Sequence, residues 1–176
     1  ADPEAREKMH NASTMAGMAF ANAFLGMSHS MAHKIGGVHH TVHGRTNAIL
    51  LPYVIRYNGT RPSKTTTWPK YNYWKADEKF QDIAKMLGLP HSTPEEAVEA
   101  YAKAVYELGV AVGIKMNFKD QGIDEKAWKD SLHEIALLAY EDQCSPANPR
   151  LPMVADMEEI MADAYYGYAE RPGRRK

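Results

Sequence analysis

The sequence is poor in cysteine, with Cys144 as its one thiol in 176 residues. A disulfide within the chain is therefore excluded, and a chain with so little cysteine suits a reducing compartment, so we expect a cytoplasmic location. The first eight residues carry five charged side chains before any apolar stretch. That pattern is unlike a secretory signal peptide, which needs an apolar stretch behind a short basic start.

The sequence also lacks net charge. Lys and Arg total 21, Asp and Glu total 22, and the formal net charge is -1. Such a balance supplies no general attraction to phosphate backbones, so we expect no nucleic-acid partner. With 44% hydrophobic and 24% charged residues, the composition also excludes a disordered or fibrous chain. A chain of this length is expected to bury about 70% of its unfolded surface, so it needs no covalent staple.

Charged side chains are missing from residues 9–33, a run of 25 residues. The run is long enough to cross a bilayer, but its polar side chains include His10, Asn11, Asn22, His29 and His33. Hydrocarbon offers these groups no hydrogen-bond partners. Alanine, glycine and methionine instead suit a helix packed on all sides inside a protein. We therefore predict a buried helix and no membrane span.

Helical periodicity dominates the rest of the chain, and no strand alternation of useful length occurs. Thr93, Pro94 and Glu96 form a helix start of the capping-box type. Pro52 should kink its helix or mark a join. The predicted helices are 4–35 as one helix or two, ended by Gly36 and Gly37, then 44–57, 75–87, 94–112, 124–140 and 152–166. We predict an all-α fold, with residues 1–170 as a single helical lobe and residues 171–176 as a basic tail.

Aromatic residues are concentrated in the predicted irregular loop 60–73 and directly after it. Trp68, Tyr71, Tyr73 and Trp74 are expected to pack this loop onto the helices. The alternative is a stacking platform for nucleotide bases, which would need more basic flanking residues than the loop has.

Five of the eight histidines fall within fifteen residues, namely His29, His33, His39, His40 and His43. His29 and His33 are four residues apart, so on a helix they share one face. The chain can return beside them after the two glycines, which would place His43 near both. Imidazole suits zinc, iron, nickel and copper, so the group is a candidate metal site. The alternative is that these are ordinary core or surface histidines.

Other chemistry is weakly indicated. No His-Glu-x-x-His, glycine-rich dinucleotide motif or phosphate-binding loop occurs. No carboxylate lies near the histidines in sequence, so local residues cannot complete a metal coordination sphere. Cys144 has no evident partner as a nucleophile, and a lone cysteine is usually structural.

The sequence AFLGMSHSMAHKIGGVHHTVHGRTNAILLPYVIRYN, with its spacing His-x3-His-x9-His before Gly44, resembles the iron-dependent alcohol dehydrogenases. REKMHNASTMAGMAFANAFLG, DQCSPANPRLP and AYYG are similar to the same family, so the resemblance covers nearly the whole chain. Within the family, the chain resembles most the alcohol dehydrogenase part of bifunctional aldehyde–alcohol dehydrogenases. The resemblance implies the helical C-terminal lobe of the dehydroquinate synthase-like fold.

Carried onto this sequence, the resemblance implies that His29 and His43 are two metal ligands. It implies that His33 is a non-ligand histidine lining the pocket near substrate and nicotinamide. The other two ligands of the family, an Asp and a His, and the NAD-binding lobe would lie upstream of residue 1. Val42 departs from the family, where Pro commonly precedes the ligand at position 43.

The implied reaction is the reversible reduction of acetaldehyde to ethanol with NADH. The implied metal is Fe²⁺, with Zn²⁺ as the alternative, acting as a Lewis acid on the carbonyl oxygen. The expected partners are the missing nucleotide-binding lobe and further copies in a homo-oligomer or filament. Two other readings are a non-catalytic helical assembly module and a stand-alone metal hydrolase, which the missing carboxylates disfavour.

Overall fold

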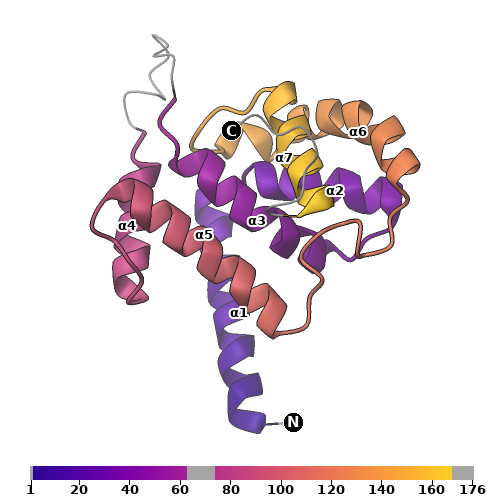
Figure 1. Ribbon diagram of the computed structural model, residues 1–176. Helices are drawn as coiled ribbons and strands as arrows, with labels where there is room; N and C mark the ends of the chain where they lie inside the picture. The colour runs from indigo at the N-terminus through magenta and orange to yellow at the C-terminus, as the bar shows by residue number, and fades with distance from the viewer. Residues whose placement is uncertain (1, 63–73, 168–176) are drawn as a thin grey trace.

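The computed structural model describes residues 2–62 and 74–167, and in this part of the chain all regular structure is helical (Figure 1). This confirms the predicted all-α class. The seven α-helices and one 3-10 turn are α1 Pro3–Ala23, α2 Met27–His39, α3 His43–Gly59, α4 Ala76–Met86, α5 Pro94–Ala111, α6 Glu125–Tyr140, η2 Ser145–Ala147 and α7 Val154–Tyr166, counted over the described residues.

The helix starts agree with their sequence signals. Thr93 Oγ1 accepts a hydrogen bond from the Glu96 backbone N–H at 3.2 Å. The Glu96 carboxylate reaches back to the N–H of Ser92 at 2.7 Å, one residue earlier than an ideal capping box. Asp124 caps α6 by accepting from the N–H of Ala127 at 2.9 Å. α3 is continuous through Pro52, so the proline marks no join.

The predicted helix over 4–35 is two helices, separated by residues 24–26. A Cβ atom on Gly26 would lie 2.7 Å from Asn148 Oδ1, so this break requires glycine. The predicted end of the second helix at Gly36 and Gly37 is wrong, because α2 continues to His39. Two helical glycines cost about 1 kcal/mol each, and the burial of the neighbouring α2 side chains outweighs this cost.

The core lies between α2, α3, α6 and α7, which Figure 1 shows gathered on one side of the molecule. Its largest fully buried side chains include Met31, Ile35, Trp128, Met157 and Tyr165. A smaller cluster of Ile55, Val98 and Ala102 joins α3 to α5. α2 and α3 are therefore held along their length by apolar packing, and they carry the histidines.

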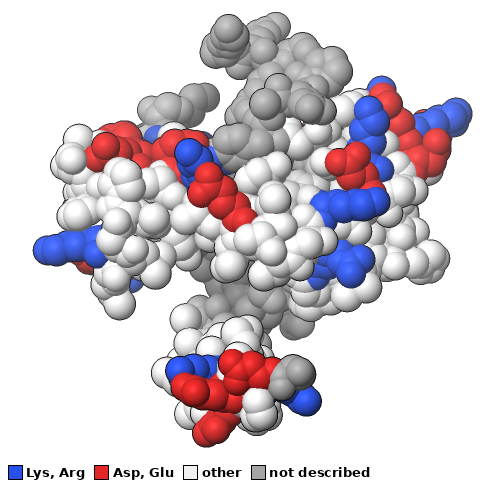
Figure 2. Space-filling view, turned by 60° about the horizontal axis from the view of Figure 1, so that its bottom comes forward, with Lys and Arg blue, Asp and Glu red and all other residues white. Residues whose placement is uncertain are grey.

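α1 differs from its prediction. None of its residues is buried, and Met9, Met15 and Met18 are 69%, 69% and 65% exposed. Figure 1 shows α1 projecting from the remainder, and Figure 2 shows the charged side chains at its free end. The prediction of a buried helix over 9–33 is right for the α2 part and wrong for α1, because no described helix packs along it.

Most of the predicted loop 60–73 lies outside the described residues, including Trp68, Tyr71 and Tyr73, and so does the predicted basic tail 171–176. Trp74 is described, and its indole N–H donates to the carbonyl oxygen of Asn58 at 3.1 Å. In α4, Ala84 is buried, whereas Leu87 just beyond the helix is 59% exposed. Among the described helices, none combines the length and apolarity that crossing a bilayer requires.

Candidate metal centre

His29, His33 and His43 form a cluster at the point where α2 and α3 meet. The ring centroids lie 5.3 Å apart for His29 and His43, 5.4 Å for His33 and His43, and 6.1 Å for His29 and His33. His29 and His33 are half-buried one turn apart on α2, and His43 is exposed as the first residue of α3. The structure therefore brings together the three histidines that the resemblance singled out.

The turn over residues 40–42 brings His43 back beside His29 and His33 of α2. His40 has a left-handed backbone conformation with φ of 53°, which ends α2 and reverses the chain. The buried Thr46 hydroxyl lies 2.6 Å from the Thr41 hydroxyl and 3.0 Å from the carbonyl oxygen of Val42. These contacts fix the turn against the first turn of α3, and so fix the place of His43.

A second bridge joins the two helices beside the rings. The Ser28 hydroxyl lies 3.0 Å from Asn47 Oδ1, and Asn47 Nδ2 lies 3.2 Å from His43 Nε2. Asn47 therefore links the residue next to His29 on α2 with His43 on α3. If Asn47 donates to His43 Nε2, that nitrogen carries no proton, and a metal bound there would take the place of the amide N–H.

The electrostatics of the cluster favour the neutral form of His29. Burial lowers the pKa of His29, and the neighbouring His43 and His33 lower it further, because charging one ring beside two others is unfavourable. Metal binding requires deprotonated ligands, so a lowered pKa prepares His29 for a cation at neutral pH. Imidazoles from two helices, open to solvent on one side, fit a divalent transition metal.

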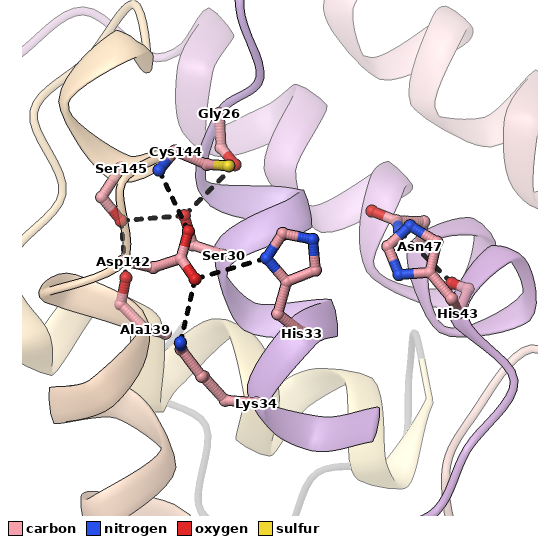
Figure 3. A network of polar contacts seen from close by, with 10 residues as sticks. All are labelled: Gly26, Ser30, His33, Lys34, His43, Asn47, Ala139, Asp142, Cys144 and Ser145. Carbon is pink, nitrogen blue, oxygen red and sulfur yellow. Dashed lines mark hydrogen bonds and ion pairs between the residues drawn. The ribbon is translucent and has the colours of Figure 1, made fainter. Parts of the chain in front are cut away.

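Asp142 is the feature of this site that the local sequence did not reveal. Its carboxylate lies behind the cluster, with Oδ2 at 3.3 Å from His33 Nδ1 and 2.9 Å from Lys34 Nζ (Figure 3). Oδ1 accepts from the backbone N–H of Cys144 at 3.0 Å. Burial alone raises the pKa of this carboxyl, but the hydrogen bonds from Cys144, Lys34 and His33 outweigh it and hold the pKa well below its usual range.

Cys144 is a buried free thiol beside the same carboxylate. Burial and the Asp142 carboxylate raise its pKa to about 11, so it stays protonated and is a poor nucleophile, as the sequence suggested. Donor atoms of His33, Asp142 and Cys144 lie within 4.8 Å of one another. A metal there would have to displace the Lys34 ion pair and the thiol proton, so we assign no cation to this trio.

The remaining histidines of the run lie elsewhere. His39 Nε2 is 3.0 Å from the Ser131 hydroxyl, and its ring lies 5.3 Å from the Trp128 ring. Burial lowers the pKa of His39, with a further contribution from His40. His40 is exposed at the turn. The two therefore act as a core-facing and a surface residue, and the candidate site is confined to three of the five histidines.

An all-helical lobe that presents imidazoles from two helices has the character of part of a metal-dependent enzyme. The sequence model described as "Fe-containing alcohol dehydrogenase family, C-terminal" matches residues 1–165. The chain belongs to this family.

Individual relatives agree with this family. The chain is 80% identical over 176 residues to aldehyde-alcohol dehydrogenase of Streptococcus pneumoniae serotype 2, covering all of this chain and 20% of that protein. It is 61% identical over 168 residues to aldehyde-alcohol dehydrogenase 2 of Entamoeba histolytica, covering 96% of this chain and 19% of that protein. The chain therefore spans about a fifth of the length of these curated relatives.

Among solved structures, a 1,3-propanediol oxidoreductase superposes with a TM-score of 0.77 at 34% identity, covering 92% of this chain and 38% of that chain. The family and the superposition together confirm the all-α C-terminal lobe expected from the sequence. The ligand roles of His29 and His43 and the pocket role of His33 stay predictions.

Proposed function

We propose that this chain is the helical, metal-holding part of an NAD-dependent alcohol dehydrogenase that interconverts acetaldehyde and ethanol. The observation that carries the proposal is the convergence of His29, His33 and His43 from two helices onto one open cluster. The names of the relatives support the reaction class, because the Streptococcus pneumoniae and Entamoeba histolytica proteins are both named aldehyde-alcohol dehydrogenase.

In this proposal, His29 and His43 hold Fe²⁺, with Zn²⁺ as the alternative. When bound, the metal supplies Lewis-acid polarisation of the carbonyl oxygen. His33 lies one turn beyond His29, so it lines the pocket beside the substrate and nicotinamide and moves a proton to or from the substrate oxygen. Two further ligands and the NAD-binding part come from the remainder of a longer protein.

Two exposed surfaces support the proposal that the remaining ligands and the NAD-binding part come from further protein. His43 is open to solvent, and α1, which is uncharged from residue 9 onward, has no cover within the described residues. Both surfaces suit contact with further protein, such as the nucleotide-binding part or another copy in a homo-oligomer or filament. We place the protein in the cytoplasm, and we propose residues 1–170 as one metal-binding lobe.

The test is to assay the full-length protein for NADH oxidation with acetaldehyde, first after metal removal and then after Fe²⁺ or Zn²⁺ is restored. Metal-dependent NADH oxidation supports the proposal, and the His43→Ala variant should lack it. If the metal-loaded protein forms intact assemblies but does not oxidise NADH, the alternative of a non-catalytic assembly module is favoured. The exposed surface of α1 is the observation that supports this alternative.

A further inference from the structure

The carboxylate of Asp142 is held by three donors and has little freedom to move. Its side chain is 7% exposed, and it lies in the turn between α6 and η2. The backbone of Cys144 holds one oxygen, while Lys34 and His33 share the other. Figure 3 shows Asp142 on one side of the His33 ring and His43 on the other.

These contacts determine where the proton of His33 resides. An ionised carboxylate accepts hydrogen bonds and cannot donate them, and the Lys34 ammonium at 2.9 Å favours the ionised form. The hydrogen between His33 and Asp142 must therefore be on His33 Nδ1. In its neutral form an imidazole carries one N–H, so with that hydrogen on Nδ1 the bare nitrogen is Nε2, which lies on the side of the ring away from Asp142 (Figure 3).

We propose that Asp142 is the positioning residue for His33, fixing the Nδ1–H tautomer and the ring orientation so that Nε2 faces the histidine cluster as a proton acceptor. This inference rests on the proposed function. In alcohol oxidation, the hydroxyl proton passes to Nε2 while the hydride leaves carbon for NAD, giving aldehyde, NADH and an imidazolium. In the reverse direction, Nε2–H returns the proton to the alkoxide oxygen, and Asp142 stays ionised throughout.

The competing explanation is that Asp142 and Lys34 form only a structural tie between α2 and the turn after α6. Asp142→Asn separates the two, because an amide turns one acceptor oxygen into an N–H donor. If the amide N–H faces His33, that ring must accept at Nδ1 and carry its hydrogen on Nε2. If it faces Cys144, two donors oppose each other. In the first arrangement Nε2 is blocked and the amide N–H also opposes the Lys34 ammonium, and in the second the side-chain amide is misplaced.

The experiment uses the full-length protein with Asp142→Asn and Asp142→Glu. We expect normal metal content for both variants. For Asp142→Asn, kcat for ethanol oxidation should fall about 100-fold while KM changes less than about threefold, since the lost step is proton transfer rather than binding. Asp142→Glu keeps the carboxylate, so its kcat should be at least about tenfold higher than that of Asp142→Asn.

A spectroscopic measurement provides a readout that does not depend on turnover. Solid-state ¹⁵N spectra of metal-free protein labelled at histidine distinguish Nδ1–H from Nε2–H, and a His33→Gln sample identifies the His33 signals. The wild type should show Nδ1–H at His33, and Asp142→Asn should shift that signal. A wild-type His33 with its hydrogen on Nε2 overturns the proposal, even if the Asn variant fails to fold.

Asp156→Asn is the matched control. The Asp156 carboxylate also accepts from a backbone N–H, that of Met153 at 2.8 Å, and from a side chain, the Tyr57 hydroxyl at 2.8 Å, but away from the cluster. This variant should lose stability and keep kcat. If Asp142→Asn behaves in the same way, the tie is only structural and the proposal is wrong. If the wild type has no dehydrogenase activity, the proposed function fails, while the spectra still decide the tautomer.

Discussion

Substituting His43 and His33 separately distinguishes a metal ligand from a pocket residue. Loss of an outer contact to a metal ligand costs about 10–100-fold in affinity. His43→Ala removes a proposed direct ligand, so in the full-length protein we expect metal affinity to fall by more than about 100-fold, or about 2.8 kcal/mol at about 1.4 kcal/mol per tenfold. His43 is the one member of the cluster that comes from α3, and its ring lies 5.3 Å from that of His29.

His33→Ala should behave differently. The Nδ1 of this ring is already engaged by Asp142 at 3.3 Å, and the ring is stacked on that of His43 with the centroids 5.4 Å apart. In the proposal His33 is not a metal ligand. We expect the metal affinity to change by less than about tenfold. The rate of hydride transfer should fall by about 10²–10⁴, the range that a lost general acid or base accounts for.

The assay is metal content by mass spectrometry after dialysis against graded chelator, followed by single-turnover measurement of NADH formation. His40→Ala is the matched control, because His40 belongs to the same turn but is exposed and outside the cluster. It should change neither quantity. Normal metal content in the His43 variant, or metal loss in the His33 variant, would show that ligand and pocket residue are assigned the wrong way round.

Three further outcomes are expected. The isolated 176-residue chain should bind Fe²⁺ or Zn²⁺ weakly and should not turn over ethanol with NAD, because two imidazoles leave ligand positions empty; turnover by the purified chain, free of longer protein, would contradict this. Asn148→Ala should lower the free energy of unfolding by about 3 kcal/mol in urea, because the buried Asn58 amide and the Met27 N–H lose their partner; a loss below about 1 kcal/mol would show that these groups find others. Because the pKa of Asp142 is lowered on folding, its stabilisation is present above about pH 4 and fades as the pH falls further; unfolding curves of wild type and Asp142→Asn should converge on acidification, and a constant difference would argue against this.

Local signals in the sequence were sufficient for most of the helices. The Thr93 cap lies where the residues indicated, and α3 and α6 lie within two residues of the predicted ranges 44–57 and 124–140. Gly36 and Gly37 misled the prediction, because a helix propensity of about 1 kcal/mol per residue is small beside the burial of Met31 and Ile35 on the same helix. The exposure of α1 was equally hidden, since an uncharged run shows that a helix can be buried but not what lies against it.

What the sequence determined by itself is the helical class and the i, i+4 pair of His29 and His33, because both follow from backbone periodicity over a few residues. The spacing to His43 and the resemblance to a family made a shared cluster foreseeable. Only the tertiary structure placed Asp142 against His33, 109 residues away along the chain. That contact depends on how α6 packs on α2 and where the following turn is directed, and packing between distant segments leaves no periodic pattern in the sequence.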